Sequence, residues 1–224
     1  MKRHSIRFPT GIAGAIFLLA IVALLMTGRL DAAPSLRDGD LIFQQSQGWQ
    51  SAAILAATGS PFTHMGIIQI RDGEAFVVEA YRRVEETPLA AWIGRGRAGH
   101  YALYRLRGIS AEQIATALDA ADARKGVPYD IFFRPDEAAI YCSELPQIAF
   151  AAAGIALGTE QQLGDLALDN EPVRSLFHER WQEHPDCAAE SGPDACWERI
   201  RNQPIITPAS IAEDERAELI FSNF

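Results

Sequence analysis

The feature that most constrains this chain is a pair of apolar segments, residues 64–70 and 75–80, separated by a short polar turn. The turn centres on Asp72-Gly73, a dipeptide that strongly favours a two-residue β-hairpin loop. With that loop, Arg71 pairs with Glu74, and the register of both strands is fixed. We therefore predict an antiparallel hairpin around which the other elements must be arranged.

This register places two polar side chains on one face of the hairpin. His64 lies opposite Tyr81 and Glu79 lies opposite Gly66. Because side chains alternate with a period of two, His64 and Glu79 are diagonal neighbours. A carboxylate at this position can orient the imidazole and leave its other nitrogen free to accept a thiol proton. A satisfied core histidine and an acid on a solvated face are the alternative interpretation.

Cys142 begins an apolar segment, residues 142–153, that reads as a helix, with Pro146 tolerated near its first turn. The N-terminus of a helix has unpaired N–H groups and the positive end of the helix dipole. Both favour a thiolate, and the same N–H groups can bind an oxyanion. The pattern indicates a nucleophilic cysteine, with a buried core thiol as the alternative.

The remaining segments mix strands and helices without a regular βαβ alternation. Strands are expected over residues 41–44, 101–106 and 219–221, and helices over 49–57, after Ser110 as far as Gly126, and after Thr207. Residues 129–133 are aromatic and fit neither class. No internal repeat or linker divides the body, so we predict one domain with an α+β fold.

The N-terminus has a different composition. Basic residues at positions 2, 3 and 7 precede an apolar run over residues 12–26, which is the pattern of an export signal. A helix over this run would be only ~22 Å long, against a hydrocarbon core of ~30 Å. Small residues are also poorly placed for a signal-peptide cleavage site. Both interpretations of the segment, a cleaved signal peptide and an uncleaved membrane anchor, therefore stay open.

We therefore predict that residues 1–33 are a signal peptide or a membrane anchor, and that residues 34–224 are the exported domain. The positive-inside rule places this domain in the periplasm or another extracytoplasmic space, with residues 12–26 as a membrane tether if they are retained. The chain has a formal net charge of −9. It has no basic stripe, which argues against a nucleic-acid partner.

The chain has three cysteines. Cys187 and Cys196 lie close together in a polar stretch and are natural disulfide partners in an oxidising compartment, which leaves Cys142 as the free thiol. A zinc site formed by these two cysteines with His178 and His184 would not match the spacing of standard zinc ligands. No metal or organic cofactor is predicted.

Several short motifs together resemble a known family. They are GDLIFQ (39–44), THMGI (63–67), VEA (78–80), GVPYD (126–130), YCSEL (141–145) and HPDC (184–187). The chain is similar over residues 36–222 to the permuted papain-fold amidases of the YaeF/YiiX group, relatives of the NlpC-type cell-wall amidases. In papain-type enzymes the cysteine precedes the histidine. The order is reversed here, as a circular permutation requires.

The resemblance implies a circularly permuted papain-like fold, with an antiparallel sheet packed against helices. It also implies that Cys142 is the nucleophile, His64 the general base and Glu79 the residue that orients His64. Tyr129 and Tyr141 are aromatic residues near the nucleophile. They are candidate substrate-binding residues, with ordinary packing as the alternative.

These observations predict an exported cysteine hydrolase that cleaves an amide bond through a thioacyl-enzyme. Its expected partner is a small peptide or other amidated substrate, of which a peptidoglycan fragment is the leading example. An acyltransferase or lipid hydrolase that uses the same Cys-His pair is one alternative. A non-catalytic binding module on the same scaffold is another.

Overall fold

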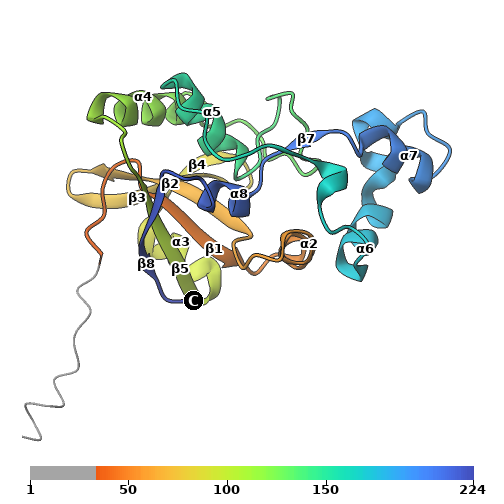
Figure 1. Ribbon diagram of the computed structural model, residues 1–224, viewed down its shortest axis with the longest axis horizontal. Coiled ribbons are helices and arrows are strands. Elements are labelled where there is room, and N and C mark those ends of the chain that lie inside the picture. The colour runs from red at the N-terminus through yellow and green to blue at the C-terminus, as the bar shows by residue number, and fades with distance from the viewer. Residues whose placement is uncertain (1–33) are drawn as a thin grey trace, which may run out of the picture. The chain divides into compact units, whose positions relative to one another are not determined.

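A six-stranded antiparallel sheet forms the centre of the fold, with the strand order β4-β3-β2-β1-β5-β8 (Figure 1). Its strands are β1 (Leu41–Ser46), β2 (His64–Arg71), β3 (Glu74–Ala80), β4 (Val84–Pro88), β5 (Gly96–Leu106) and β8 (Ala217–Ser222). The computed structural model describes residues 34–224. The sheet belongs to the compact unit Leu36–Phe224.

The predicted hairpin register is confirmed by the pairing of β2 with β3. Arg71 is opposite Glu74 and Ile67 is opposite Val78. The turn residues Asp72 and Gly73 have φ angles of 52° and 82°. Those left-handed values define the type I′ turn, whose twist matches that of the flanking strands.

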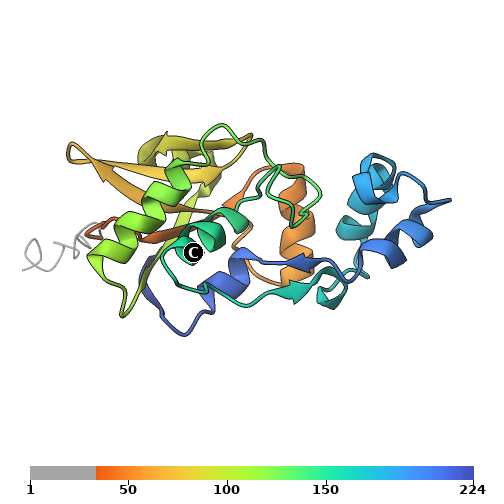
Figure 2. The same cartoon turned by 90° about the horizontal axis from the view of Figure 1, so that it is seen from above.

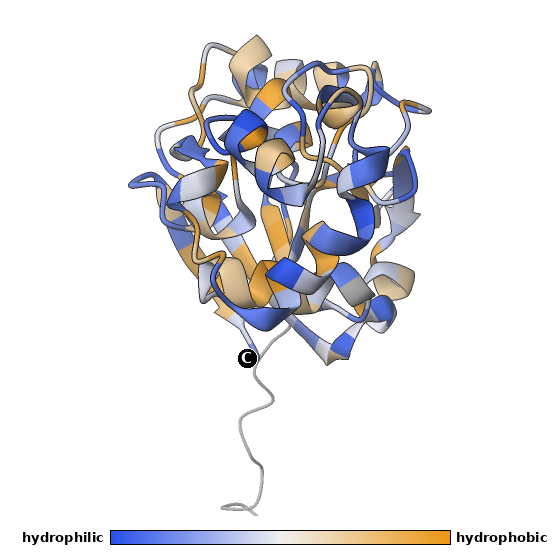
Figure 3. Ribbon diagram, turned by 90° about the vertical axis from the view of Figure 1, so that its right-hand side faces the viewer, coloured by the Kyte–Doolittle hydropathy of each residue, from blue (hydrophilic) through white to orange (hydrophobic). Residues whose placement is uncertain are grey.

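Helices cover both faces of the sheet (Figure 2). The α-helices of the described residues are α2 (Trp49–Thr58), α3 (Leu89–Arg95), α4 (Ala111–Asp122), α5 (Glu144–Ala152), α6 (Glu171–Arg180), α7 (Pro193–Ile200) and α8 (Pro208–Ala212), of which α6 and α7 lie away from the sheet. The larger core lies between one sheet face and helices α4 and α5. A smaller core on the other face surrounds Trp92 of α3. Figure 3 shows the apolar residues gathered along the central strands and the polar residues along the outer helices.

The segment between α5 and α8 carries a small helical region that we call the disulfide lobe, residues 163–203. It contains α6, α7 and the 3-10 helices η1 (Leu163–Asp165), η2 (Trp181–Glu183) and η3 (Pro185–Cys187). Strands β6 (Gln161–Gln162) and β7 (Pro204–Ile205) pair at its base. Cys187 and Cys196 form a disulfide inside it, packed with Ile200 and neighbouring aromatic side chains.

The α+β class and the antiparallel sheet packed against helices are as predicted, but some element boundaries differ. Helix α5 begins at Glu144 with Ser143 as its N-cap, so Cys142 precedes the helix instead of starting it. Helix α4 has the expected Ser110–Gln113 capping box but ends at Asp122, before the turn that reaches Gly126. Strand β5 begins at Gly96, earlier than predicted.

Strand β4 and helix α3 are not predicted by the sequence pattern. Strand β4 has the sequence VEETP at the edge of the sheet. An edge strand exposes one side and tolerates charged residues, so it shows no alternation of apolar and polar positions. Within the described residues, no helix has the length and apolar character needed to span a membrane. The predicted export segment, residues 1–33, lies outside those residues.

Gly66 allows strands β2 and β3 to approach closely beside Glu79. A Cβ atom at Gly66 would collide with Cγ1 of Val77 and would lie 2.8 Å from the carbonyl oxygen of Val78. We predict that Gly66→Ala lowers the free energy of unfolding by about 1–3 kcal/mol through overpacking. Denaturant-induced unfolding measures this change.

Gly94 of α3 provides the control, because a Cβ there would meet no atom within 4 Å. Gly94→Ala should leave stability unchanged or raise it by up to about 1 kcal/mol, since alanine favours helix. Equal effects of the two substitutions would show that the strand approach at Gly66 is not tight.

Candidate active site

The centre of the site is a buried contact between the predicted histidine and glutamate. Nε2 of His64 lies 2.6 Å from Oε2 of Glu79. The Glu79 side chain has no solvent exposure, and His64 is 6% exposed. The hairpin register brings the two side chains together, since β2 and β3 present them diagonally on the face that also carries α3.

Three further residues hold the Glu79 carboxylate. The Thr87 hydroxyl of β4 donates to Oε1 at 2.5 Å, and the Trp92 indole N–H of α3 donates to Oε2 at 3.0 Å. The Arg95 guanidinium, at the end of α3, forms an ion pair with Oε1. A buried carboxylate needs this many partners, because its desolvation costs several kcal/mol. Thr87, Trp92 and Arg95 lie on the elements that the sequence pattern does not predict.

The His64 ring is also fixed by aromatic contacts. It stacks on Trp92 with ring centroids 6.0 Å apart, and the edge of Tyr81 lies 6.1 Å away. Arg95 in turn lies over the Tyr81 ring, 4.1 Å from its centroid. The residues that hold Glu79 therefore also limit the rotation of the imidazole.

Cys142 completes the cluster. It is the free cysteine of the described residues and is 2% exposed. Its thiol lies beside the His64 imidazole and the Tyr129 hydroxyl, and it raises the pKa of both groups. The adjacent Ser143 hydroxyl donates to the carbonyl oxygen of Ile206 at 2.9 Å, so it packs the segment against β7. The structure thus brings Cys142, His64 and Glu79 together in one buried cluster.

The surroundings of His64 favour its charged form. Burial lowers the pKa of His64, but the hydrogen bonds and negative charges of Cys142 and Glu79 outweigh burial and raise it to about 9. Burial raises the pKa of Glu79, but His64, Thr87 and Arg95 together lower it below its ordinary value. His64 is therefore an imidazolium at neutral pH, and a cation beside a cysteine favours the nucleophilic thiolate.

The structure separates the two candidate substrate-binding tyrosines. Tyr129 lies beside the Cys142 sulfur, and burial together with the charge of Cys142 raises the pKa of its hydroxyl. It remains a proton donor at neutral pH. The Tyr141 hydroxyl instead accepts the N–H of Ile206 at 3.1 Å, and its ring packs edge-on against Phe133. The backbone thus occupies the Tyr141 hydroxyl, which favours the packing alternative for this residue.

A cleft of about 750 Å³ opens in front of His64, within the size range of small-molecule sites. Its wall includes Gln44, Tyr81, Arg82 and Tyr129. We call it the His64 cleft.

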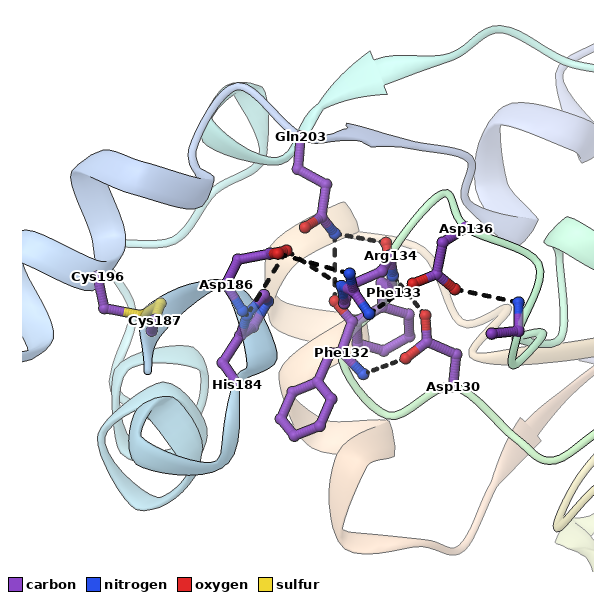
Figure 4. A network of polar contacts seen from close by, with 11 residues as sticks. Asp130, Phe132, Phe133, Arg134, Asp136, His184, Asp186, Cys187, Cys196 and Gln203 are labelled. Atoms are coloured by element: carbon purple, nitrogen blue, oxygen red, sulfur yellow. Dashed lines mark hydrogen bonds and ion pairs between the residues drawn. A yellow bond between two sulfur atoms is a disulfide. The ribbon is translucent and has the colours of Figure 1, made fainter. Parts of the chain in front are cut away.

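The loop that leads to Cys142 is tied to the disulfide lobe (Figure 4). Arg134 forms ion pairs with Asp136 at 2.5 Å and with Asp186 at 3.0 Å. Gln203 donates from its amide to the carbonyl oxygens of Phe132, at 3.1 Å, and Phe133. The lobe therefore helps to fix the chain between Tyr129 and Cys142.

The donor set of the described residues does not fit a resident metal ion. In the structurally described part, no three His, Cys, Asp or Glu side chains are grouped to bind one. Cys187 and Cys196 are joined to each other, and Nδ1 of His184 accepts the N–H of Asp186 at 3.2 Å. The carboxylate of Glu79 is fully occupied by protein donors.

An antiparallel sheet that carries a histidine, followed later in the chain by a cysteine before a helix, defines a papain-like protein with permuted connectivity. A family model described as "permuted papain-like amidase enzyme, YaeF/YiiX, C92 family" matches residues 35–221. The chain belongs to this family, as its motifs suggested.

Two relatives from Escherichia coli are similar to this chain. The uncharacterized protein YiiX of strain K12 is 36% identical over 145 residues, which cover 64% of this chain and 72% of that protein. The crystal structure of YiiX from strain O157:H7 has a TM-score of 0.74 at 28% identity, and the match covers 84% of this chain and 98% of that one. Its title calls that protein a metalloprotein.

The raised pKa of His64 gives a test of the cluster. We predict that the His64 imidazole titrates near pH 9 in an NMR titration of the intact protein. Glu79→Gln should lower this midpoint, because it removes the negative charge that stabilises the imidazolium. The raised pKa of His64 also makes the stability of the fold depend on pH. The stability that His64 contributes is fully present below its ordinary pKa of 6.5 and is lost as the pH rises through about 9.

The control is Glu85→Gln, which removes the acid directly opposite Glu79 on β4. The midpoint of His64 should not move in this variant. A midpoint near 6.5 in the intact protein, or an equal shift in both variants, would contradict the proposed coupling.

Proposed function

We propose that this protein is a cysteine hydrolase that cleaves an amide bond through Cys142, His64 and Glu79. The observation that carries the proposal is the buried cluster in which Glu79 hydrogen-bonds to His64 and Cys142 lies beside His64. Membership of a family described as amidase enzymes supports the reaction class.

In this mechanism the Cys142 thiolate attacks the amide carbonyl carbon and forms a carbon–sulfur bond. The His64 imidazolium gives its proton to the departing amine as the carbon–nitrogen bond breaks, which leaves a thioester and a neutral imidazole. Water then attacks the thioester, and His64 takes up one proton. The acid product leaves, and the thiolate–imidazolium pair is restored.

The tetrahedral intermediates need donors for their oxyanion. Backbone N–H groups at the start of α5 follow directly after Cys142, and such groups stabilise negative charge. The Tyr129 hydroxyl lies beside the sulfur and stays protonated. We assign it as a further donor to the substrate oxygen.

A cell-wall peptide or a similar small amidated compound is the proposed substrate class, with the domain exported from the cytoplasm. The basic and apolar N-terminal pattern supports export. The disulfide between Cys187 and Cys196 suits an oxidising compartment.

A second candidate function is acyl transfer from the same thioester to an acceptor other than water. One observation favours it, which is an apolar pocket that has Cys142 in its wall. Product analysis distinguishes the two reactions: hydrolysis releases a free acid, whereas transfer yields an ester or amide of the acceptor.

We predict that an electrophilic probe such as iodoacetamide labels Cys142 alone in the folded protein, since the other two cysteines form a disulfide. Cys142→Ala should abolish both the labelling and all amide hydrolysis. Cys142→Ser keeps the shape of the site and should retain only a trace of activity, because serine is a weaker nucleophile next to an imidazolium.

Intact-mass spectrometry detects the label, and incubation with a cell-wall digest followed by the same measurement detects a thioacyl adduct. Ser143→Ala is the matched control, because the Ser143 hydroxyl donates its hydrogen bond to the carbonyl oxygen of Ile206 and not to the reacting groups. It should leave labelling of Cys142 unchanged. Continued hydrolysis by Cys142→Ala would overturn the proposal.

A further inference from the structure

The wall of the His64 cleft contains buried polar atoms that have no hydrogen-bond partner among the described residues. They are Oε1 of Gln44, Nε2 of Gln50 and Nε of Arg95. Gln44 is only 2% exposed, so bulk water has little access to its side chain. A buried donor or acceptor without a partner costs free energy, and native proteins contain few of them. The cleft therefore presents one acceptor and two donors that the described part of the protein does not use.

A third glutamine in the same wall is paired by the protein. Nε2 of Gln47 donates to the carbonyl oxygens of Arg95, at 3.2 Å, and Gly96, at 3.1 Å. The unpaired amide atoms are thus specific to Gln44 and Gln50, and are not a property of every glutamine in the cleft.

Gln44 lies directly beside His64. The two residues are opposite each other where β1 pairs with β2, and opposed residues of an antiparallel pair place their side chains on the same face. Packing holds the Gln44 amide in place, because a Cβ atom at Gly96 would collide with Oε1 of Gln44 and would lie 3.2 Å from its Cδ. Gly96 therefore leaves the space that the amide fills. The amide is positioned before a ligand arrives, as an effective binding group must be.

The proposed chemistry defines which part of the substrate meets these glutamines. The amine product takes its proton from His64, so the departing part of the substrate lies in the cleft that His64, Gln44 and Gln50 line. A peptide group carries one N–H donor and one C=O acceptor. These two groups match the unused acceptor of Gln44 and the unused donor of Gln50, whereas an alkyl amine would leave both unsatisfied.

We infer that Gln44 and Gln50 are substrate-binding residues that hydrogen-bond to an amide group in the departing part of the substrate. Gln44 accepts the N–H of this amide, and Gln50 donates to its C=O. The substrate is accordingly a peptide with at least one further amide on the amine side of the bond that is cleaved. This inference rests on the proposed amidase function and narrows it. The carbon–nitrogen bond breaks, Cys142 retains the acyl group, and the departing amine takes the proton of His64.

Three synthetic amides that differ only in the departing amine test the inference on the full chain. N-acetylalanylalanine N-methylamide has the N–H and C=O of a second peptide group, N-acetylalanylalanine methyl ester keeps only the C=O, and N-acetylalanine pentan-2-ylamide has neither. Release of the amine is measured. The kcat/KM should be highest for the N-methylamide, about tenfold lower for the methyl ester and lower again for the pentan-2-ylamide. A site built to hydrogen-bond a substrate group discriminates against an analogue that lacks it.

Two variants assign each contact to its residue. Gln44→Met removes the acceptor and should abolish the preference for the N-methylamide over the methyl ester. Gln50→Met removes a donor and should reduce the preference for the methyl ester over the pentan-2-ylamide. The matched control is Gln45→Met, which makes the same change at the next position of β1, outside the cleft and on the opposite face of the sheet. This control should leave both preferences unchanged.

Stability separates a role in binding from a structural role. Because Oε1 of Gln44 pairs with no group of the described residues, Gln44→Met should leave the midpoint of thermal unfolding unchanged or raise it, while the substrate preference is lost. A lower midpoint together with an unchanged preference would assign Gln44 to the packing of the fold, and would overturn the inference.

The failure of this inference is distinguishable from the failure of the proposed function. If Cys142 reacts with iodoacetamide but the protein hydrolyses none of the three amides, or hydrolyses all of them equally, the substrate inference is overturned and the cysteine chemistry stands. The same preferences in Gln44→Met as in Gln45→Met would also overturn it, and would show that water satisfies the buried amide. If Cys142 does not react with iodoacetamide in the folded protein, the proposed function fails as well.

Discussion

The ionic hydrogen bond between Glu79 and His64 joins adjacent strands of the sheet at a point where both side chains are buried. Such a contact forms only when the remaining oxygen lone pairs of the carboxylate are also satisfied, because an unpaired buried charge is strongly destabilising. Thr87 and Trp92 supply these donors from β4 and α3, and Arg95 supplies the balancing charge. The site therefore depends on the complete assembly of one half of the sheet with its covering helix.

In the permuted connectivity, two separate parts of the chain supply the residues of the site. Strands β2 and β3 hold the imidazole and its carboxylate, and the segment before α5 brings the cysteine to them. The loop between Tyr129 and Cys142 has little regular structure of its own. It is fixed from outside by Arg134, Asp186 and Gln203 (Figure 4). The disulfide lobe thus both positions this loop and lines the apolar pocket that has Cys142 in its wall.

The sequence predicted the hairpin best, because the Asp72-Gly73 turn and the two-residue period fix the register without tertiary information. That register also brought His64 and Glu79 together. Cys142 was predicted to begin a helix, whereas α5 begins two residues later at Glu144, because capping by Ser143 uses no side-chain hydrogen bond that the sequence would reveal. Thr87, Trp92 and Arg95 could not be predicted, since their role comes from the folding of an edge strand and a short helix around Glu79.

The central claim is that Glu79 acts on Cys142 through His64. A double-mutant cycle tests it most directly, with the rate of Cys142 alkylation by iodoacetamide at neutral pH measured in the intact protein, Glu79→Gln, His64→Gln and the double variant. We predict that each single substitution slows alkylation and that the double variant is no slower than His64→Gln alone. A double variant slowed by the product of the two single effects would show that the residues act independently, and would contradict this account.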